Sequence, residues 1–158
     1  MTAQDLPEHA NDLVLTRLFD IPADTLYRCW TEPALIQQWF APSPWSVARV
    51  DNDVRPGGHS LIVMRSPEGQ EMPGSGVYLE VIPNRRLVFT DAFTQGWVPA
   101  DKPFMTGIVT FDPEGSQTRY TARVRHWNAA DRAQHEAMGF HSGWGQCADQ
   151  LAELAARL

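Results

Sequence analysis

The chain has 158 residues, 43% of them hydrophobic and 20% charged, and its formal net charge is −6. That balance is typical of one globular domain and unlike that of a disordered chain. The negative charge argues against nucleic-acid binding and against binding to an anionic membrane, because both need a basic surface. The two cysteines are too few for a disulfide framework, and no apolar run approaches the ~20 residues that span a membrane. We therefore expect a cytoplasmic protein without membrane insertion.

The first strand should follow a loose N-terminal segment. Residues 1–12 are polar and acidic and lack the apolar stretch of a signal peptide, so we expect a flexible tail followed by one domain at 13–158. Apolar residues alternate, with one slip, along Leu13–Asp20, and this pattern predicts a strand. The strand should end at Pro22, because a proline cannot donate to the hydrogen-bond ladder of a sheet.

Two short helices should come next. The first is predicted at Ala23–Trp30. Thr31 can cap the second, with Pro33 in its first turn, where the missing N–H of proline does no harm. Four apolar residues at helical spacing should lie on this second helix, which has to end before the prolines that follow: Leu35, Ile36, Trp39 and Phe40.

The middle of the chain alternates apolar and polar residues with period two, which is typical of strands. Turns rich in proline and glycine separate the runs, and consecutive strands joined in this way form an antiparallel meander. A longer loop at 94–103 carries Trp97, which could be a lid over a pocket or a dimer contact. The six predicted strands are Trp45–Asp51, Gly58–Ser66, Ser75–Ile82, Arg86–Phe93, Met105–Asp112 and Thr118–Trp127.

One long helix is predicted to end the chain. Asn128 can cap it, because Asp131 follows three residues later as in an imperfect capping box. Apolar residues at intervals of three and four form a stripe from Ala133 to Leu158, which should lie on the sheet. A kink with a flexible pocket entrance, or close packing around Trp144, would explain the glycines inside this helix, each of which costs roughly 1 kcal/mol relative to alanine. These glycines are Gly139, Gly143 and Gly145.

Four segments, spread in order over nearly the whole chain, carry a family resemblance. They are Phe19-Asp20-Ile21-Pro22-Ala23 with Trp30-Thr31-Glu32-Pro33 and Trp39-Phe40; Asp53-Val54-Arg55-Pro56-Gly57-Gly58 with Met64; Gly76-Val77-Tyr78-Leu79-Glu80-Val81 with Pro83 and Arg86-Leu87-Val88-Phe89-Thr90; and Gly143-Trp144-Gly145-Gln146-Cys147 with Leu151 and Leu154. Taken together, they resemble the activator of heat-shock-protein-90 ATPase-like family, a branch of the START-like (SRPBCC) superfamily.

The resemblance implies an α+β domain with the helix-grip fold. A curved antiparallel sheet of about seven strands should wrap around a long C-terminal helix, with two short helices after the first strand. A cavity between that helix and the concave face of the sheet is also implied. Members of the superfamily include lipid carriers, hormone and antibiotic binders, cyclases, hydrolases and co-chaperone domains, so the fold by itself does not select a function.

Strand alternation indicates which side chains should face this cavity. On the last strand, the even-numbered residues from Tyr120 to His126 should point inward, because the odd-numbered positions carry arginines. The resemblance suggests that Tyr78 and Glu80 also face the cavity. A mostly apolar pocket with a few polar groups is the usual small-molecule site. The predicted ligand-binding residues are Trp39, Trp45, Met64, Tyr78, Glu80, Phe89, Asp91, Phe93, His126, Met138, His141 and Trp144.

One set of these groups could be catalytic. His126 with Asp91 or Glu80 could form an acid–base pair. The same groups could instead bond to each other or to a ligand, and Glu80 could simply face solvent. The histidines and cysteines show neither HExxH nor CxxC spacing, so neither a metal site nor a cofactor is predicted.

Three functions stay open at this point. The first is the binding of a small apolar or amphipathic molecule in the cavity. The second, suggested by the resemblance alone, is stimulation of a chaperone, the heat-shock-protein-90 ATPase; co-chaperone members carry an additional N-terminal domain, where this chain has a dozen residues. The third is a cyclase or hydrolase reaction on an apolar substrate. The chain could be a monomer or a homodimer.

Overall fold

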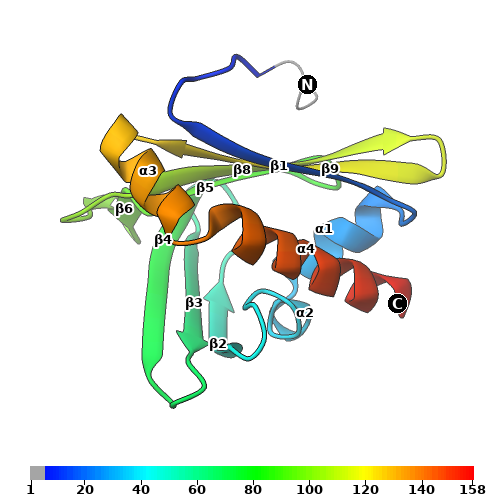
Figure 1. The fold of residues 1–158 in the computed structure, drawn as a ribbon, viewed down its shortest axis with the longest axis horizontal. Coiled ribbons are helices and arrows are strands. Elements are labelled where there is room, and N and C mark those ends of the chain that lie inside the picture. The colour runs from blue at the N-terminus through cyan, green and yellow to red at the C-terminus, as the bar shows by residue number, and fades with distance from the viewer. Residues whose placement is uncertain (1–5) are drawn as a thin grey trace.

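A seven-stranded antiparallel sheet forms the frame of the molecule, and helix α4, Phe140–Ala156, crosses its concave side (Figure 1). The computed structural model describes residues 6–158, so positions 1–5 of the predicted tail lie outside the described residues. The strand order is β1-β9-β8-β5-β4-β3-β2. These strands are β1 (Asp12–Phe19), β2 (Ser46–Asn52), β3 (His59–Arg65), β4 (Glu71–Ile82), β5 (Arg86–Thr90), β8 (Met105–Glu114) and β9 (Gln117–His126).

The predicted α+β helix-grip architecture is therefore confirmed. The six strands from β2 to β9 follow each other as a meander, and β1 closes the sheet by pairing with β9. One predicted strand is shorter than expected, because β5 ends at Thr90. The chain then forms a small separate hairpin from β6 (Phe93–Thr94) and β7 (Val98–Pro99), within which Trp97 packs on Phe93 at 5.8 Å between ring centroids.

Two short helices follow β1, as predicted, but the second begins differently. Helix α1 spans Ala23–Thr31, and helix α2 spans only Pro33–Ile36, with Glu32 at its N-cap position. The prediction that Thr31 caps α2 is wrong. Its hydroxyl donates instead to the Tyr27 carbonyl at 2.9 Å, one turn back in α1. Bonding to the preceding turn is a common alternative for threonine inside a helix.

The predicted continuous C-terminal helix is two helices, α3 (Ala129–Ala137) and α4. Its beginning is confirmed, because the Asn128 side chain accepts a hydrogen bond from the Asp131 N–H at 2.8 Å. Gly139 breaks the helix with φ +95°, a left-handed conformation that glycine adopts without a Cβ clash. All nine residues of α3 are described and none is buried, so the apolar stripe that packs on the sheet begins at Phe140 rather than Ala133.

The core lies between the concave face of the sheet and helices α1 and α4. Tyr120, Ala122 and Val124 of β9 are fully buried, which confirms their predicted inward direction. Pairing in register places Ala122 beside Val109 and Leu15, so neighbouring strands add one apolar layer to the next. Each large side chain buried in this way stabilises the fold by about 1.5–3 kcal/mol before chain entropy is counted.

A bulge in β4 changes which side chains face the core. The register shifts between Tyr78 and Glu80: Tyr78 pairs with Phe89, whereas Glu80 pairs with Val88. Cross-strand partners share a face of the sheet, and successive residues of a strand alternate faces. Glu80 therefore lies on the outer face, where it contacts the buried Arg86 at 2.9 Å, and this corrects the prediction that it points into the cavity.

The start of β1 is tied to two other elements. Asp12 contacts Arg123 of β9 at 3.1 Å and Arg125 at 3.7 Å, and its side chain is only 4% exposed. The Asp12 carbonyl also accepts a hydrogen bond from Nε of Arg132 in α3 at 3.0 Å. These contacts link the N-terminal strand, the last strand and the first C-terminal helix. In the described part of the chain, no helix is long and apolar enough to cross a membrane.

Candidate ligand-binding site

A cavity of about 220 Å³ lies where α4 and the Gly139 hinge approach α1, β3 and β9. For comparison, an apolar cavity of about 150 Å³ binds benzene, so a substituted single ring fits here. Across the described residues, the lining includes no Asp, Glu, Lys or Arg side chain. The lining consists of Trp30, Trp39, Phe40, Pro42, Met64, Tyr120, His135, Met138, Gly139, Phe140, Gly143, Trp144 and Cys147.

Aromatic rings build two walls of the cavity. Trp30 stands at the centre of one wall, with ring centroids 5.0 Å from Trp39, 5.6 Å from Phe40 and 5.8 Å from Phe89. On the side of α4, Phe140 and Trp144 are 5.4 Å apart, one helical turn from each other. Such pairs contribute about 0.5–1.5 kcal/mol beyond their buried area, so these walls are firmly held.

The Trp39 indole compensates for a proline. In a regular helix, the carbonyl of residue 29 would accept a hydrogen bond from the N–H of residue 33, but Pro33 has no N–H. Nε1 of Trp39 donates to the Cys29 carbonyl instead, at 2.8 Å in the buried interior. The bond fixes the Trp39 ring against the end of α1 and so positions part of the cavity wall.

The Trp30 indole is in the opposite situation. Trp30 is only 5% exposed, and its Nε1–H has no hydrogen-bond partner among residues 6–158. The Tyr120 hydroxyl is close enough for the indole to affect its pKa, although the two groups do not reach hydrogen-bond geometry. Burial raises the pKa of Tyr120 well above its ordinary value, so this hydroxyl keeps its proton at neutral pH.

Two histidines form a chain of hydrogen bonds that ends at the cavity. Nδ1 of His126 lies 2.7 Å from the Asn11 carbonyl, and its Nε2 lies 2.9 Å from Nδ1 of His135. A carbonyl can only accept, so Nδ1 of His126 carries the hydrogen. When both rings are neutral, Nδ1 of His135 must donate to His126, and Nε2 of His135 is left as an acceptor. Burial and the nearby His126 lower the pKa of His135 to about 4.

Four of the twelve predicted ligand-binding residues line this cavity: Trp39, Met64, Met138 and Trp144. Phe89 and His126 lie one shell behind it, packed on Trp30 and bonded to His135 respectively. Trp45 is half-buried after the Pro42–Pro44 turn, and Phe93 belongs to the small hairpin with Trp97.

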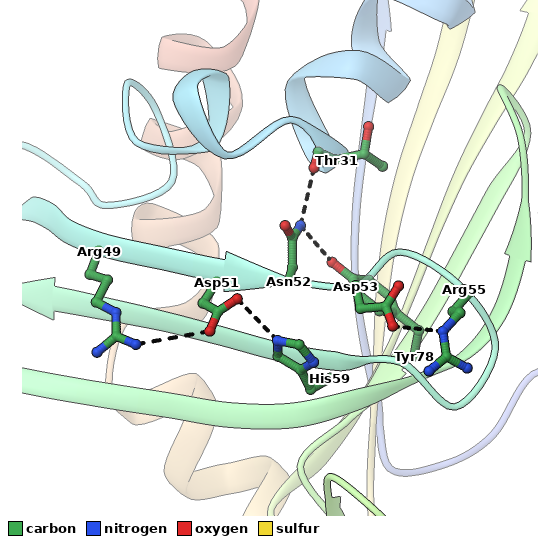
Figure 2. A network of polar contacts seen from close by, with 8 residues as sticks. All are labelled: Thr31, Arg49, Asp51, Asn52, Asp53, Arg55, His59 and Tyr78. Carbon is green, nitrogen blue, oxygen red and sulfur yellow. Dashed lines mark hydrogen bonds and ion pairs between the residues drawn. The ribbon is translucent and has the colours of Figure 1, made fainter.

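Tyr78 is buried but does not belong to the cavity lining, and Figure 2 shows its hydroxyl beside Asn52 of β2. Nδ2 of Asn52 donates both to the Tyr78 hydroxyl at 3.2 Å and to the Thr31 carbonyl at 3.1 Å. Its neighbour on β2, Asp51, points to the other face and contacts His59 at 3.1 Å (Figure 2). Burial raises the pKa of Tyr78, so its hydroxyl stays uncharged. Through Asn52, this hydroxyl links β4 to β2 and to the end of α1.

The three candidate catalytic groups bond to other partners. Oδ1 of Asp91 accepts from the backbone N–H groups of Phe104 and Met105 at 2.9 and 3.1 Å, which holds the start of β8. Glu80 pairs with Arg86 on the outer face, and His126 bonds to His135. His141 is exposed and contacts Glu136 at 3.0 Å. Within residues 6–158, no cluster of three or more His, Cys, Asp or Glu side chains could hold a metal ion.

A second hollow of about 330 Å³ opens beside His126, lined by His9, Thr106, Arg125, His126 and Trp127. It is wider than the first cavity and more open to solvent, and an arginine lies in its wall. A small ligand is buried much less in an open hollow, and burial supplies most of the affinity of an apolar ligand. The cavity beside α4 is therefore the better candidate site.

Several cavity residues were not predicted. Trp30 lies on the buried side of α1, and nothing in its helical spacing distinguishes it from a core residue. His135 lies on α3, and it reaches the cavity because Gly139 turns α3 away from the axis of α4. Cys147 of α4 was not predicted to be a cavity residue either. It lines the cavity, but burial raises its pKa to about 11, so it is an apolar wall and not a nucleophile.

The chain is similar to known proteins over most of its length. A family model described as activator of Hsp90 ATPase homolog 1-like protein matches residues 20–156. No curated protein matches the chain. A solved structure from Nitrosomonas europaea is 42% identical, with 95% of this chain and 97% of the other covered and a TM-score of 0.91. A Mycobacterium smegmatis protein is 25% identical over 90% and 89% of the two chains, with a TM-score of 0.77.

Proposed function

The chain belongs to the activator of Hsp90 ATPase homolog 1-like family of START-like proteins, and we propose that it binds a small apolar or amphipathic molecule in the cavity beside α4. The observation that carries this proposal is the cavity itself, about 220 Å³ in volume and walled by aromatic rings. Filling it with an apolar molecule removes ligand surface from water, and each Å² of apolar surface buried in this way favours binding by about 25 cal/mol.

Gly143 offers a way to close the cavity without disturbing the fold. It lines the cavity, and a Cβ built on it meets no heavy atom of the described chain within 4 Å. Leucine is also a better helix former than glycine, so Gly143→Leu should fill the space without loss of stability. Glu153→Leu is the matched control, because it adds the same side chain at an exposed position of the same helix, outside the lining.

We expect the hydrocarbon α-methylstyrene to bind the wild-type protein at one saturable site, measured by chemical-shift titration of the amide and indole N–H signals. Gly143→Leu should weaken this binding at least tenfold, whereas Glu153→Leu should leave it unchanged. Unaltered binding to Gly143→Leu, or no saturable binding of small apolar molecules to the wild type, would show that the cavity is not the site.

A further inference from the structure

The described lining of the cavity contains few polar side chains, and most of them are inaccessible. Trp30, Trp39 and Tyr120 are 5%, 3% and 1% exposed, so a bound molecule has little access to their polar atoms. The Cys147 thiol already bonds to a backbone carbonyl, at 3.6 Å. His135 differs from these residues, because its ring belongs to the lining and is also partly exposed. It is therefore the polar side chain of this lining that a ligand can best reach.

One nitrogen of the His135 ring has no partner. Nδ1 lies 2.9 Å from Nε2 of His126, whereas no residue of 6–158 bonds to Nε2 of His135. Nor is this Nε2 one of the fully buried atoms that lack a partner, so part of its surface is accessible. The two nitrogens of an imidazole flank a single carbon atom, so Nε2 points away from His126 while Nδ1 faces it. The unpaired nitrogen is thus at the free end of the ring.

The hydrogen-bond chain determines what this nitrogen can do. Nδ1 of His126 donates to the Asn11 carbonyl at 2.7 Å, so with neutral rings Nε2 of His126 accepts from Nδ1 of His135. Nε2 of His135 then carries a lone pair and no hydrogen. The pKa of His135 is about 4, so its ring is neutral around pH 7. Because the ring is held between Phe104 and Phe140, this acceptor has a fixed direction.

The charge and size of the cavity restrict the ligand further. The described lining has no carboxylate, so an ammonium group would lose its hydration there without gaining a counter-ion. A hydroxyl group is an uncharged donor and avoids this cost. The volume of about 220 Å³ holds roughly one substituted ring, and the walls are aromatic.

From these observations we infer that the cavity selects an uncharged ring compound with a hydroxyl group, such as a phenol, whose O–H donates to Nε2 of His135. This inference rests on the proposed function, because it names the ligand class of the same cavity. It assigns His135 as the residue that determines specificity, whereas the rest of the lining supplies apolar contact.

The test compares two ligands of nearly equal shape: p-cresol, which carries a hydroxyl group, and p-xylene, which has a methyl group in its place. The two molecules differ in hydration, so the quantity measured is the ratio of their dissociation constants in the wild type and in two variants. This ratio cancels the difference in hydration, which is the same for every form of the protein.

His135→Phe removes the acceptor and keeps an aromatic ring between Phe104 and Phe140. It should weaken the binding of p-cresol relative to p-xylene by about fivefold or more, because the hydroxyl group would be buried without a partner. His141→Phe makes the same replacement at an exposed position outside the lining, and it should leave the ratio unchanged.

The ring nitrogens of the wild-type protein give a readout that does not depend on the folding of a variant. At about pH 8 an ordinary histidine is neutral. Nitrogen NMR of the free protein at this pH should show a hydrogen on Nδ1 of His135 and none on its Nε2. Addition of p-cresol should shift the Nε2 signal, whereas p-xylene should shift it much less.

The outcomes separate the two proposals. A hydrogen on Nε2 of His135 in the free protein, or an unchanged ratio in His135→Phe, would overturn the assignment of His135 and leave the cavity as a site for apolar molecules. Equal shifts of the Nε2 signal with both ligands would also overturn it, since the lone pair would then face solvent and not the ligand. Failure of p-cresol, p-xylene and α-methylstyrene alike to bind would instead overturn the proposed function.

Discussion

At the scale of single residues, His135 connects the cavity to the stability of the fold. Its ring packs on Phe104 and Phe140, and its Nδ1 bonds to His126, which in turn bonds to the Asn11 carbonyl. The pKa of His135 falls from 6.5 to about 4 in the folded chain, because burial and His126 disfavour its charged form. Between these two pH values the unfolded chain binds a proton that the folded chain does not.

Stability should therefore fall as the pH drops from about 6.5 towards 4, and this contribution is fully present above pH 6.5. We expect His135 to account for about 1 kcal/mol of lost unfolding free energy between pH 7 and pH 5, less than full linkage allows because the ring is only partly buried. Urea unfolding of the wild type and His135→Phe at both pH values measures the difference. The same pH dependence in both proteins would contradict this role.

Residue-level directions were predictable where strands are regular. The alternation along β9 correctly placed Tyr120, Ala122 and Val124 in the core, because arginines on the other face make the register unambiguous. The inward direction of Glu80, which the family resemblance suggested, was wrong, because the bulge after Tyr78 adds one residue and reverses the faces beyond it. Nor does the sequence show that Trp30 lacks a hydrogen-bond partner, since this depends on how α1 packs.

At the scale of secondary-structure elements, two glycines in one stretch have different roles. Gly139 has φ +95°, and a Cβ there would come within 3.1 Å of the Ser142 hydroxyl. Gly143 lies inside α4 with open space around the position of its Cβ. Left-handed conformations cost residues other than glycine roughly 1–2 kcal/mol, whereas replacing glycine with alanine inside a helix gains up to about 1 kcal/mol.

We therefore expect Gly139→Ala to lower the free energy of unfolding by about 1–2 kcal/mol and Gly143→Ala to leave it unchanged or raise it by up to about 1 kcal/mol. Thermal or urea denaturation of the two variants side by side is the measurement, and each serves as the control for the other. Equal effects of the two substitutions would mean that the break at Gly139 is not needed for the fold.

The elements themselves could largely be predicted from the sequence. Period-two runs between proline–glycine turns gave the strands, and Asn128 marked the start of the C-terminal helical region. The break at Gly139 was one of two explanations for the glycines, and helical spacing does not distinguish them. The choice depends on tertiary packing, because Phe140 buries its ring while Ala133 and Ala137 find no apolar surface.

At the scale of the whole molecule, Asp12 holds distant parts of the chain together. Its carboxylate is shared between Arg123 and Arg125 of β9, and the two arginine side chains are 12% and 24% exposed. Asp51 provides a contrast, because its contacts with Arg49 and His59 lie on an exposed surface. Removing one partner of a buried pair leaves an uncompensated charge, whereas exposed pairs contribute little.

Asp12→Asn should thus lower the free energy of unfolding by about 2–4 kcal/mol, because it leaves two poorly solvated guanidinium groups without a counter-ion. Asp51→Asn, the same change at the surface, should alter it by no more than about 0.5 kcal/mol. Urea unfolding at neutral pH measures both. Similar values for the two variants would show that Asp12 does not hold β1 against β9.

The division of the C-terminal segment has a consequence for the molecule as a whole. Helix α3 is held by its Asn128 cap, the His126–His135 bond and the bond from Arg132 to Asp12, without buried residues among its described positions. Its local unfolding should cost far less than the opening of the sheet. Because Met138 and Gly139, which connect it to α4, belong to the cavity wall, we expect local unfolding of α3 to open this wall. A ligand that binds only when this wall is closed would increase the fraction of molecules in which α3 is folded against the sheet.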